Sequence, residues 1–297
     1  MERAVKIKVY FSIIFSILFW GFSFVWTKQA LEVYSPITVI FFRLTISVIF
    51  LYILGKIFSF LKPVEKKDWK KFLLIAFWEP FSYFIGENYG LTQVSPTTAS
   101  VIIATIPVFS PIAAYYFHKE KITILNFLGI LLSVVGVFLV VLKTGFDFKI
   151  NLKGLLFLFW AVISAVLYTV LVYGITKKYD VFTIVVYQNI FGALMFLPLF
   201  IFMEFNTVLA TPFVASAWLA IILLAIFASS FAFILFAYGI KHIGISRTNT
   251  LLNFIPVFTA LFSFLVLGER FSWFNILGIF IVISGVLLAQ QRFKITK

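Results

Sequence analysis

Cysteine is absent from this 297-residue sequence, and histidine occurs only twice. Without cysteine the chain cannot form disulfides or thiolate metal sites, and the redox compartment cannot be read from it. A membrane enzyme would need clustered nucleophiles, bases or metal ligands, yet His118, His242 and the three aspartates are scattered near loops. No Gly-x-x-x-x-Gly-Lys-Ser/Thr motif is present to serve a nucleotide-driven pump. The sequence therefore predicts no enzyme activity, no metal and no cofactor.

Charge is also scarce, and the composition is that of a membrane protein. Charged residues make up 12% of the chain and hydrophobic residues 63%, with a mean hydropathy of +1.11. A soluble domain is roughly 45–50% apolar and about 25% charged. A soluble fold of about 300 residues buries only ~75% of its surface, so lipid must be the solvent here.

The apolar runs are long and continuous, which favours helices over the alternating pattern of a barrel. A helix needs about 20 apolar residues to cross the hydrocarbon core. The sequence predicts an all-α integral membrane protein with about ten transmembrane helices. These are expected near residues 9–28, 36–54, 72–92, 97–117, 122–142, 154–175, 181–203, 215–240, 247–267 and 273–290.

The formal net charge of +13 is best explained by topology. In a soluble protein it would suggest a nucleic-acid partner, but here the basic residues lie in short loops between spans. Most of them fall on one side if the N-terminus is cytoplasmic, including the cluster in the 62–71 connection. Positive residues mark the cytoplasmic side. We expect a cytoplasmic (inner) membrane protein with both termini inside and no nucleic-acid partner.

The second half of the chain repeats the first at an offset of 149 residues. Pro107-Val108-Phe109 meets Pro256-Val257-Phe258, and glycine, asparagine and glutamate positions also match without a gap. Each half, 1–148 and 149–297, contains five predicted spans. Because five is odd, the second half must enter the membrane from the opposite side. Such an inverted repeat is common among secondary transporters.

The residues that recur in this way resemble the EamA family of the drug/metabolite transporter superfamily. The resemblance covers nearly the whole chain, is specific as to family and weak as to substrate. It rests on Trp20-Gly21, Lys28, Pro36, Arg43, the stretch from Tyr89 to Ser95, Ile106 to Phe109, Glu120 and the Gly129/Gly136 pair.

This resemblance implies two inverted five-helix bundles around a central cavity lined mainly by spans 1–4 and 6–9. The two halves differ chemically, because Trp160-Ala161 replaces Trp20-Gly21 and Gln188 falls near the position that corresponds to Arg43. It also implies a small-molecule substrate, and export fits it better than uptake.

Pro107 and Pro256 fall near the middle of two equivalent spans. A proline inside a helix removes one hydrogen bond and displaces the carbonyl four residues earlier, so a kink is expected at each. A packing kink is the plain alternative. Their equivalence and their polar neighbours favour paired hinges beside a cavity; these neighbours are Ser100, Asn249 and Asn253.

Glu79, Tyr83 and Glu87 are spaced four residues apart, which places them on one stripe of a helix. An acidic residue within a span costs about 2.5–3.5 kcal/mol on insertion scales, so the stripe should face the interior. It could recognise a substrate ammonium group or bind a coupling proton. A permanently charged structural network is an equal alternative.

Two arginines lie within predicted spans and suggest two charged pairs. Arg43 and Glu87 are at similar depth, ~10 Å from the outer surface, so they are natural partners. Glu79 is expected closer to Arg247, at the inner end of its span. Such pairs at opposite ends of a cavity would make plausible gates.

Small residues in spans 5 and 10 predict close helix packing, with the protein a monomer or a weak homodimer. The function that best fits the sequence is secondary transport of small metabolites, with amino acids or related amphipathic compounds as the best guess. A channel or a lipid scramblase is the alternative, because kinked helices around a polar interior serve those functions too.

Overall fold

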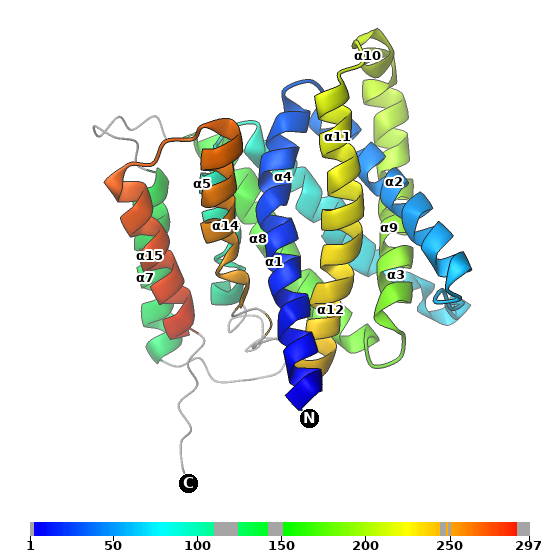
Figure 1. The fold of residues 1–297 in the computed structure, drawn as a ribbon, viewed down its shortest axis with the longest axis horizontal. Helices are drawn as coiled ribbons and strands as arrows, with labels where there is room; N and C mark the ends of the chain where they lie inside the picture. The colour runs from blue at the N-terminus through cyan, green and yellow to red at the C-terminus, as the bar shows by residue number, and fades with distance from the viewer. Residues whose placement is uncertain (1–2, 110–123, 142–150, 244–247, 249–250, 290–297) are drawn as a thin grey trace.

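The computed structural model describes residues 3–109, 124–141, 151–243, 248 and 251–289, and within these ranges the regular structure is helical, without strands. Figure 1 shows the helices standing roughly side by side. The longer α-helices are α1 (Arg3–Leu31), α2 (Pro36–Ile57), α7 (Ile124–Val141), α8 (Leu152–Ile175), α9 (Val181–Leu199), α12 (Ala232–Ile243) and α15 (Trp273–Ala289). The shorter ones are α3 (Trp69–Ala76), α4 (Tyr83–Leu91), α5 (Pro96–Ile103), α10 (Phe205–Ala210), α11 (Ala215–Leu223) and α14 (Ile255–Phe262).

Within the described residues, five continuous helical stretches are long and apolar enough to cross a membrane. They are 7–31, 36–57, 152–175, 181–210 and 215–243. Shorter apolar helices cover 96–109, 127–140, 255–267 and 273–288. The helices lie where the sequence predicts spans, but several of those spans are interrupted.

The predicted helix over 72–92 is broken at Glu79 and Pro80, which corrects the expectation of one regular stripe. Glu79 has non-helical backbone angles (φ −151°, ψ 117°) inside the π-helical segment η2 (Phe77–Ser82). Pro80 has no N–H to donate, so a regular α-helix cannot continue through it. The break separates α3 from α4 and leaves Glu79 at the junction.

Helix breaks also precede both predicted hinge prolines. α5 ends at Ile103, a turn follows at 104–105, and helical structure resumes at Ile106. In the second half a turn occupies 253–254 before α14, which carries Pro256 in its first turn. Proline is favoured at that position because its missing N–H would have no helical partner. The two expected kinks are therefore present, each just before its proline.

Contacts also recur between equivalent positions of the two halves. The Arg43 Nε atom donates a hydrogen bond to Ser229 Oγ at 2.5 Å. In the repeat, Gly192 corresponds to Arg43 and Pro80 corresponds to Ser229. Gly192 and Pro80 also pack against each other. The helices that carry Arg43 and Gly192, α2 and α9, run in opposite directions in Figure 1.

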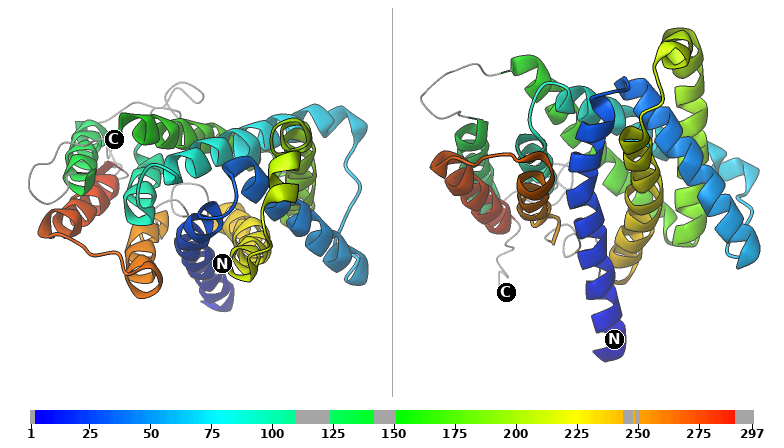
Figure 2. Two further views of the ribbon diagram at one scale, coloured as in Figure 1. Left: turned by 90° about the horizontal axis from the view of Figure 1, so that it is seen from above. Right: turned by 45° about the horizontal axis from the view of Figure 1, so that its top comes forward.

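α7 and α15 form a tightly packed pair at one edge of the molecule, as both views in Figure 2 show. A methyl group at Gly136 would meet Val282 backbone nitrogen at 2.6 Å, and one at Gly285 would meet Ser133 backbone nitrogen at 2.7 Å. Only glycine permits this approach of the two backbones. The small residues of these two helices therefore pack against each other within one chain.

α1 begins and α15 ends at the same end of the molecule, and α10 lies at the opposite end (Figure 1). Large apolar side chains on the outer faces are exposed, such as Phe202, Trp273 and Phe280. Exposed apolar surface on this scale needs lipid around it. A few charged side chains are buried in the interior instead, among them Arg43, Glu79 and Glu87, and they set the place of the candidate site.

Candidate functional site

A buried cavity lies between elements of the two halves. Its volume is about 60 Å³. The lining includes both polar and aromatic side chains from α1, α2, η2, α4, α8 and α12. Among the lining residues are Trp20, Phe24, Arg43, Glu79, Tyr83, Phe84, Glu87, Ala165, Tyr168, Phe233 and Phe236.

Arg43 is fixed from three sides. Its Nε atom donates to Ser229 in the π-helical segment η4 (Leu224–Phe231), and its guanidinium carbon lies 4.1 Å from the centre of the Phe84 ring. Its Nη1 atom is 3.8 Å from Glu87 Oε2. The expected contact between Arg43 and Glu87 is thus present, and both residues are at most 4% exposed. The guanidinium is held in one orientation before any substrate binds.

Glu87 has a second partner on its own helix. Tyr83 donates its hydroxyl to Glu87 Oε1 at 2.9 Å. The two residues are one turn apart on α4, which allows this bond. One carboxylate oxygen of Glu87 is therefore hydrogen-bonded and the other faces Arg43.

Glu79 lines the same cavity but is differently placed. Its residue is 7% exposed, and within the described part of the chain its carboxylate has neither a hydrogen bond nor an ion pair. An isolated buried carboxylate is costly unless a partner compensates for the lost water. Among the described residues, Glu79 is therefore a carboxylate of the cavity without a protein partner.

The second half contributes a buried tyrosine that the sequence analysis missed. Tyr168 lines the cavity and donates its hydroxyl to Gln188 Oε1 at 3.1 Å. Gln188, a predicted site residue, is thus placed behind the lining, where it orients Tyr168. The sequence signal for Tyr168 was weak because a single tyrosine in an apolar run is common in membrane helices.

A buried polar cluster supports Arg43 from behind. Asn189 donates to Ser47 Oγ at 2.8 Å and to the Ser229 carbonyl at 2.9 Å, and the hydroxyls of Ser47 and Ser230 are 2.7 Å apart. A π-helical turn changes the register of backbone hydrogen bonds, so side chains can bond its carbonyls. This cluster joins α2, α9 and η4.

Trp20 lies on the cavity as the sequence predicted. Its indole nitrogen donates to the Ala228 carbonyl at 3.3 Å, and its ring packs edge-on against Phe233 and Phe236. The cavity wall formed by Trp20, Phe233 and Phe236 is therefore aromatic, and its rings are packed against one another.

Other predicted site residues lie away from the cavity. Lys28 donates to the carbonyls of Leu91 and Val94 at 2.8 and 3.3 Å, so it caps the C-terminal end of α4. Ser100 is buried and bonds the Thr97 carbonyl at 2.9 Å. Asn253 is buried at the break before α14.

Arg247 and Asn249 lie outside the described residues. The predicted pairing of Glu79 with Arg247 therefore stays a prediction.

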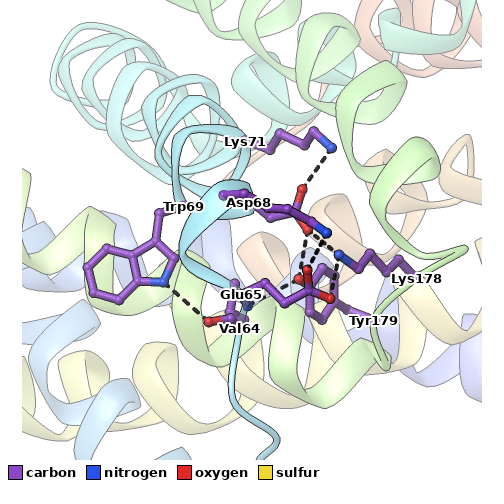
Figure 3. A network of polar contacts seen from close by, with 8 residues as sticks. Val64, Glu65, Asp68, Trp69, Lys71, Lys178 and Tyr179 are labelled. Carbon is purple, nitrogen blue, oxygen red and sulfur yellow. Dashed lines mark hydrogen bonds and ion pairs between the residues drawn. The ribbon is translucent and has the colours of Figure 1, made fainter.

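A second network ties the two halves together at the α2–α3 and α8–α9 connections. Asp68 is 3% exposed, and its carboxylate bonds Lys71 at 2.8 Å, Lys178 at 2.5 Å and the Tyr179 hydroxyl at 2.8 Å. Glu65 also pairs with Lys178, at 2.7 Å. Figure 3 shows these side chains converging on one another. The sequence analysis treated this segment as a solvated basic loop and missed the network.

These contacts shift the pKa values of three side chains in the network. Hydrogen bonding from Lys178 lowers the pKa of Asp68 well below its ordinary range, and Lys71 and Tyr179 act in the same direction. The pKa of Glu65 is lowered, chiefly by Lys178. Conversely, the hydrogen bond to Asp68 raises the pKa of Lys178. Asp68, Glu65 and Lys178 are therefore charged at neutral pH.

A comparison with protein families identifies the family to which the chain belongs. The model of the EamA-like transporter family matches the chain twice, over residues 7–142 and 152–290. The chain belongs to the EamA-like transporter family. Membership makes it a membrane transporter, for which a lipid bilayer and a small-molecule substrate are implied. It also confirms the family resemblance given by the sequence.

Two relatives are similar to this chain along almost their whole length. An "Uncharacterized transporter YdfC" from Bacillus subtilis (strain 168) is 27% identical over 291 residues, which cover 98% of this chain and 93% of the relative. An "Uncharacterized transporter" from Archaeoglobus fulgidus is 24% identical over 280 residues, 93% of this chain and 96% of the relative.

A solved structure described as "Crystal structure of protein" has the same fold. It aligns with a TM-score of 0.70 at 17% identity, over 95% of this chain and 96% of the other. At that identity the likeness concerns the fold alone.

Proposed function

We propose that this protein is a secondary transporter that exports small amphipathic metabolites, such as amino acids or related compounds, across the cytoplasmic membrane by alternating access. The observation that carries the proposal is the charged cavity between the two halves. Arg43, Glu79 and Glu87 come from the first half, and Tyr168 and Phe233 from the second. A relative movement of the halves would then change the access to all of these groups at once.

Ten spans in two inverted five-helix repeats, 1–148 and 149–297, are part of this proposal. The paired family matches, the helix breaks before Pro107 and Pro256, and the opposite directions of α2 and α9 support it. Two similar halves of opposite orientation can adopt two mirrored arrangements of comparable energy. Each arrangement opens the cavity toward one side.

The size of the cavity supports a need for movement. Its ~60 Å³ holds only small occupants, whereas sites for small organic ligands are usually ~300–1,000 Å³. The surrounding helices must therefore separate before a metabolite can enter. The breaks before Pro107 and Pro256 are the places where two of these helices can bend.

We propose that both termini of the chain lie on the cytoplasmic side of the membrane. Lys66 and Asn206 are both exposed, and the chain has no cysteine to interfere with labelling. We expect Lys66→Cys to react with an impermeant thiol reagent only from the cytoplasmic side and Asn206→Cys only from outside. Reaction of Lys66→Cys in intact cells would overturn the orientation.

Counterflow in proteoliposomes tests the function. Purified full-length protein is reconstituted, the vesicles are loaded with one unlabelled solute, and uptake of the labelled solute is measured against protein-free vesicles. Saturable, trans-stimulated uptake supports a carrier. Ion currents without saturation would indicate a channel, and movement of labelled lipid between leaflets a scramblase.

Proton coupling belongs to the same proposal, since Glu79 could bind a proton in exchange for substrate. An imposed pH gradient that drives the solute against its own gradient would support it. Flux that is indifferent to the pH gradient would show uniport.

A further inference from the structure

The charges that line the cavity do not balance. Among the described lining residues, Arg43 is the one cationic side chain, while Glu79 and Glu87 are both carboxylic acids. The ion pair of Arg43 is with Glu87, whose Oε2 atom lies 3.8 Å from Arg43 Nη1. With both acids ionised, the described lining residues carry one net negative charge, and Glu79 is the acid that has no partner among them.

Arg43 already has one anionic neighbour, Glu87, although its Nη1 atom makes no hydrogen bond within the described residues. Ser229, the Phe84 ring and Glu87 occupy three sides of its guanidinium. An amino acid would bring a carboxylate as well as an ammonium group. That carboxylate would have to share Arg43 with Glu87, and two carboxylates beside one guanidinium leave one buried negative charge uncompensated, which is costly.

The uncharged part of the lining is aromatic and apolar. Phe24, Phe84, Phe233 and Phe236 line the cavity together with Trp20. Such walls fit an apolar body, and aromatic ring faces also attract an organic ammonium group. A hard metal cation would need several oxygen ligands. No group of three or more histidine or acidic side chains suitable for a metal occurs in the described residues.

We infer that the substrate is a monocationic amine with an apolar body and no carboxylate, whose ammonium group binds the carboxylate of Glu79. This inference rests on the proposed transport function, and within its small amphipathic metabolites it favours amines without a carboxylate over amino acids. Tyr83 bonds Glu87, and Glu87 faces Arg43, so these three residues are partners of one another. Glu79 is then the residue that selects amines over amino acids.

Matched pairs of solutes test the inference directly. The probes are 2-phenylethylamine against phenylalanine and isoamylamine against leucine, because each pair differs by one carboxylate. Binding to the purified wild-type protein and counterflow in proteoliposomes are measured for each. We expect the amine to be preferred in both pairs by roughly tenfold or more. Equal or stronger binding of the amino acids would overturn the inference.

Substitution of Glu79 provides the second arm. Glu79→Gln keeps the size of the side chain and removes its charge, and we expect amine binding to fall by roughly tenfold or more. Glu79→Asp should retain part of it. Glu204→Gln is the matched control, because Glu204 lies outside the cavity lining. Unchanged amine binding in a folded Glu79→Gln protein would also overturn the inference.

The outcomes separate this inference from the proposed function. Saturable exchange of amino acids, with no exchange of amines, would leave the transporter in place and refute the amine assignment. Absence of exchange for these pairs and for a wider panel of metabolites would refute the transport proposal itself. The wild-type comparison needs no variant, so a misfolded Glu79→Gln protein would not prevent a decision.

Discussion

The buried pair formed by Arg43 and Glu87 gives a prediction whose size can be worked from the structure. The charges are 3.8 Å apart, which corresponds to about 4 kcal/mol at an effective dielectric constant of about 20. Removing one partner of a buried pair typically costs ~3–5 kcal/mol, because the other charge stays buried without compensation. Arg43→Met should lie at the upper end, since it also leaves Ser229 and Phe84 without their partner.

Glu87→Met should cost less than Arg43→Met. The arginine would keep its hydrogen bond to Ser229 and its contact with Phe84. The double variant should recover much of the loss, because replacing both charges by apolar groups is often neutral. We expect a coupling free energy of about 2–3 kcal/mol from the cycle.

Thermal unfolding in detergent and counterflow flux are the two assays for this cycle. Either single change should lower the melting temperature by roughly 10 °C and impair flux. Recovery of both stability and flux in the double variant would make the pair structural. Recovery of stability alone would add a role in transport. Additive effects of the single changes on both readouts would show that the residues do not interact and would refute the reasoning.

Three further predictions test other parts of the account. Pro107→Ala and Pro256→Ala should each slow transport more than they weaken substrate binding, because the helices can then continue through the breaks; equal losses of rate and affinity would contradict a hinge. Gly136→Ala should destabilise the protein by about 1–3 kcal/mol through overlap with α15, whereas Gly174→Ala, where an added methyl group meets nothing, should be neutral or stabilising by up to ~1 kcal/mol; similar melting temperatures for the two would contradict the close packing. The lowered pKa of Asp68 means that its contribution to stability is present at neutral pH and is lost as the pH falls below about 4; Asp68→Asn should remove this acid sensitivity, and an unchanged pH profile of the melting temperature would refute it.

The all-helical, lipid-embedded character of the fold could be predicted from the sequence because lipid imposes strong constraints on a chain. Continuous apolar runs must form helices, and the repeat placed Pro107 and Pro256 at equivalent sites where the structure has equivalent breaks. The interruption at Glu79 was missed because Pro80 was not weighed. Pro80 interrupts the helix there although the surrounding hydrophobic pattern predicts a continuous one.

The candidate site was only partly predictable, because depth along a helix can be estimated from sequence whereas rotation around its axis cannot. Matched depth was enough to pair Arg43 with Glu87. It could not show that Lys28 turns toward backbone carbonyls or that Gln188 lies behind Tyr168. The network at Asp68 was hidden for another reason. Its partners lie on a connection 110 residues later, and a basic loop on its own looks solvated.

The central claim, that the cavity opens alternately to the two sides, is tested most directly by a single cysteine at Ala165, which lines the cavity. The residue is 5% exposed, so a small impermeant thiol reagent reaches it only when a path opens. In oriented vesicles we expect Ala165→Cys to react from either side, and a bound substrate to slow both reactions. Reaction from one side only, under every substrate and pH condition tested, would contradict alternating access.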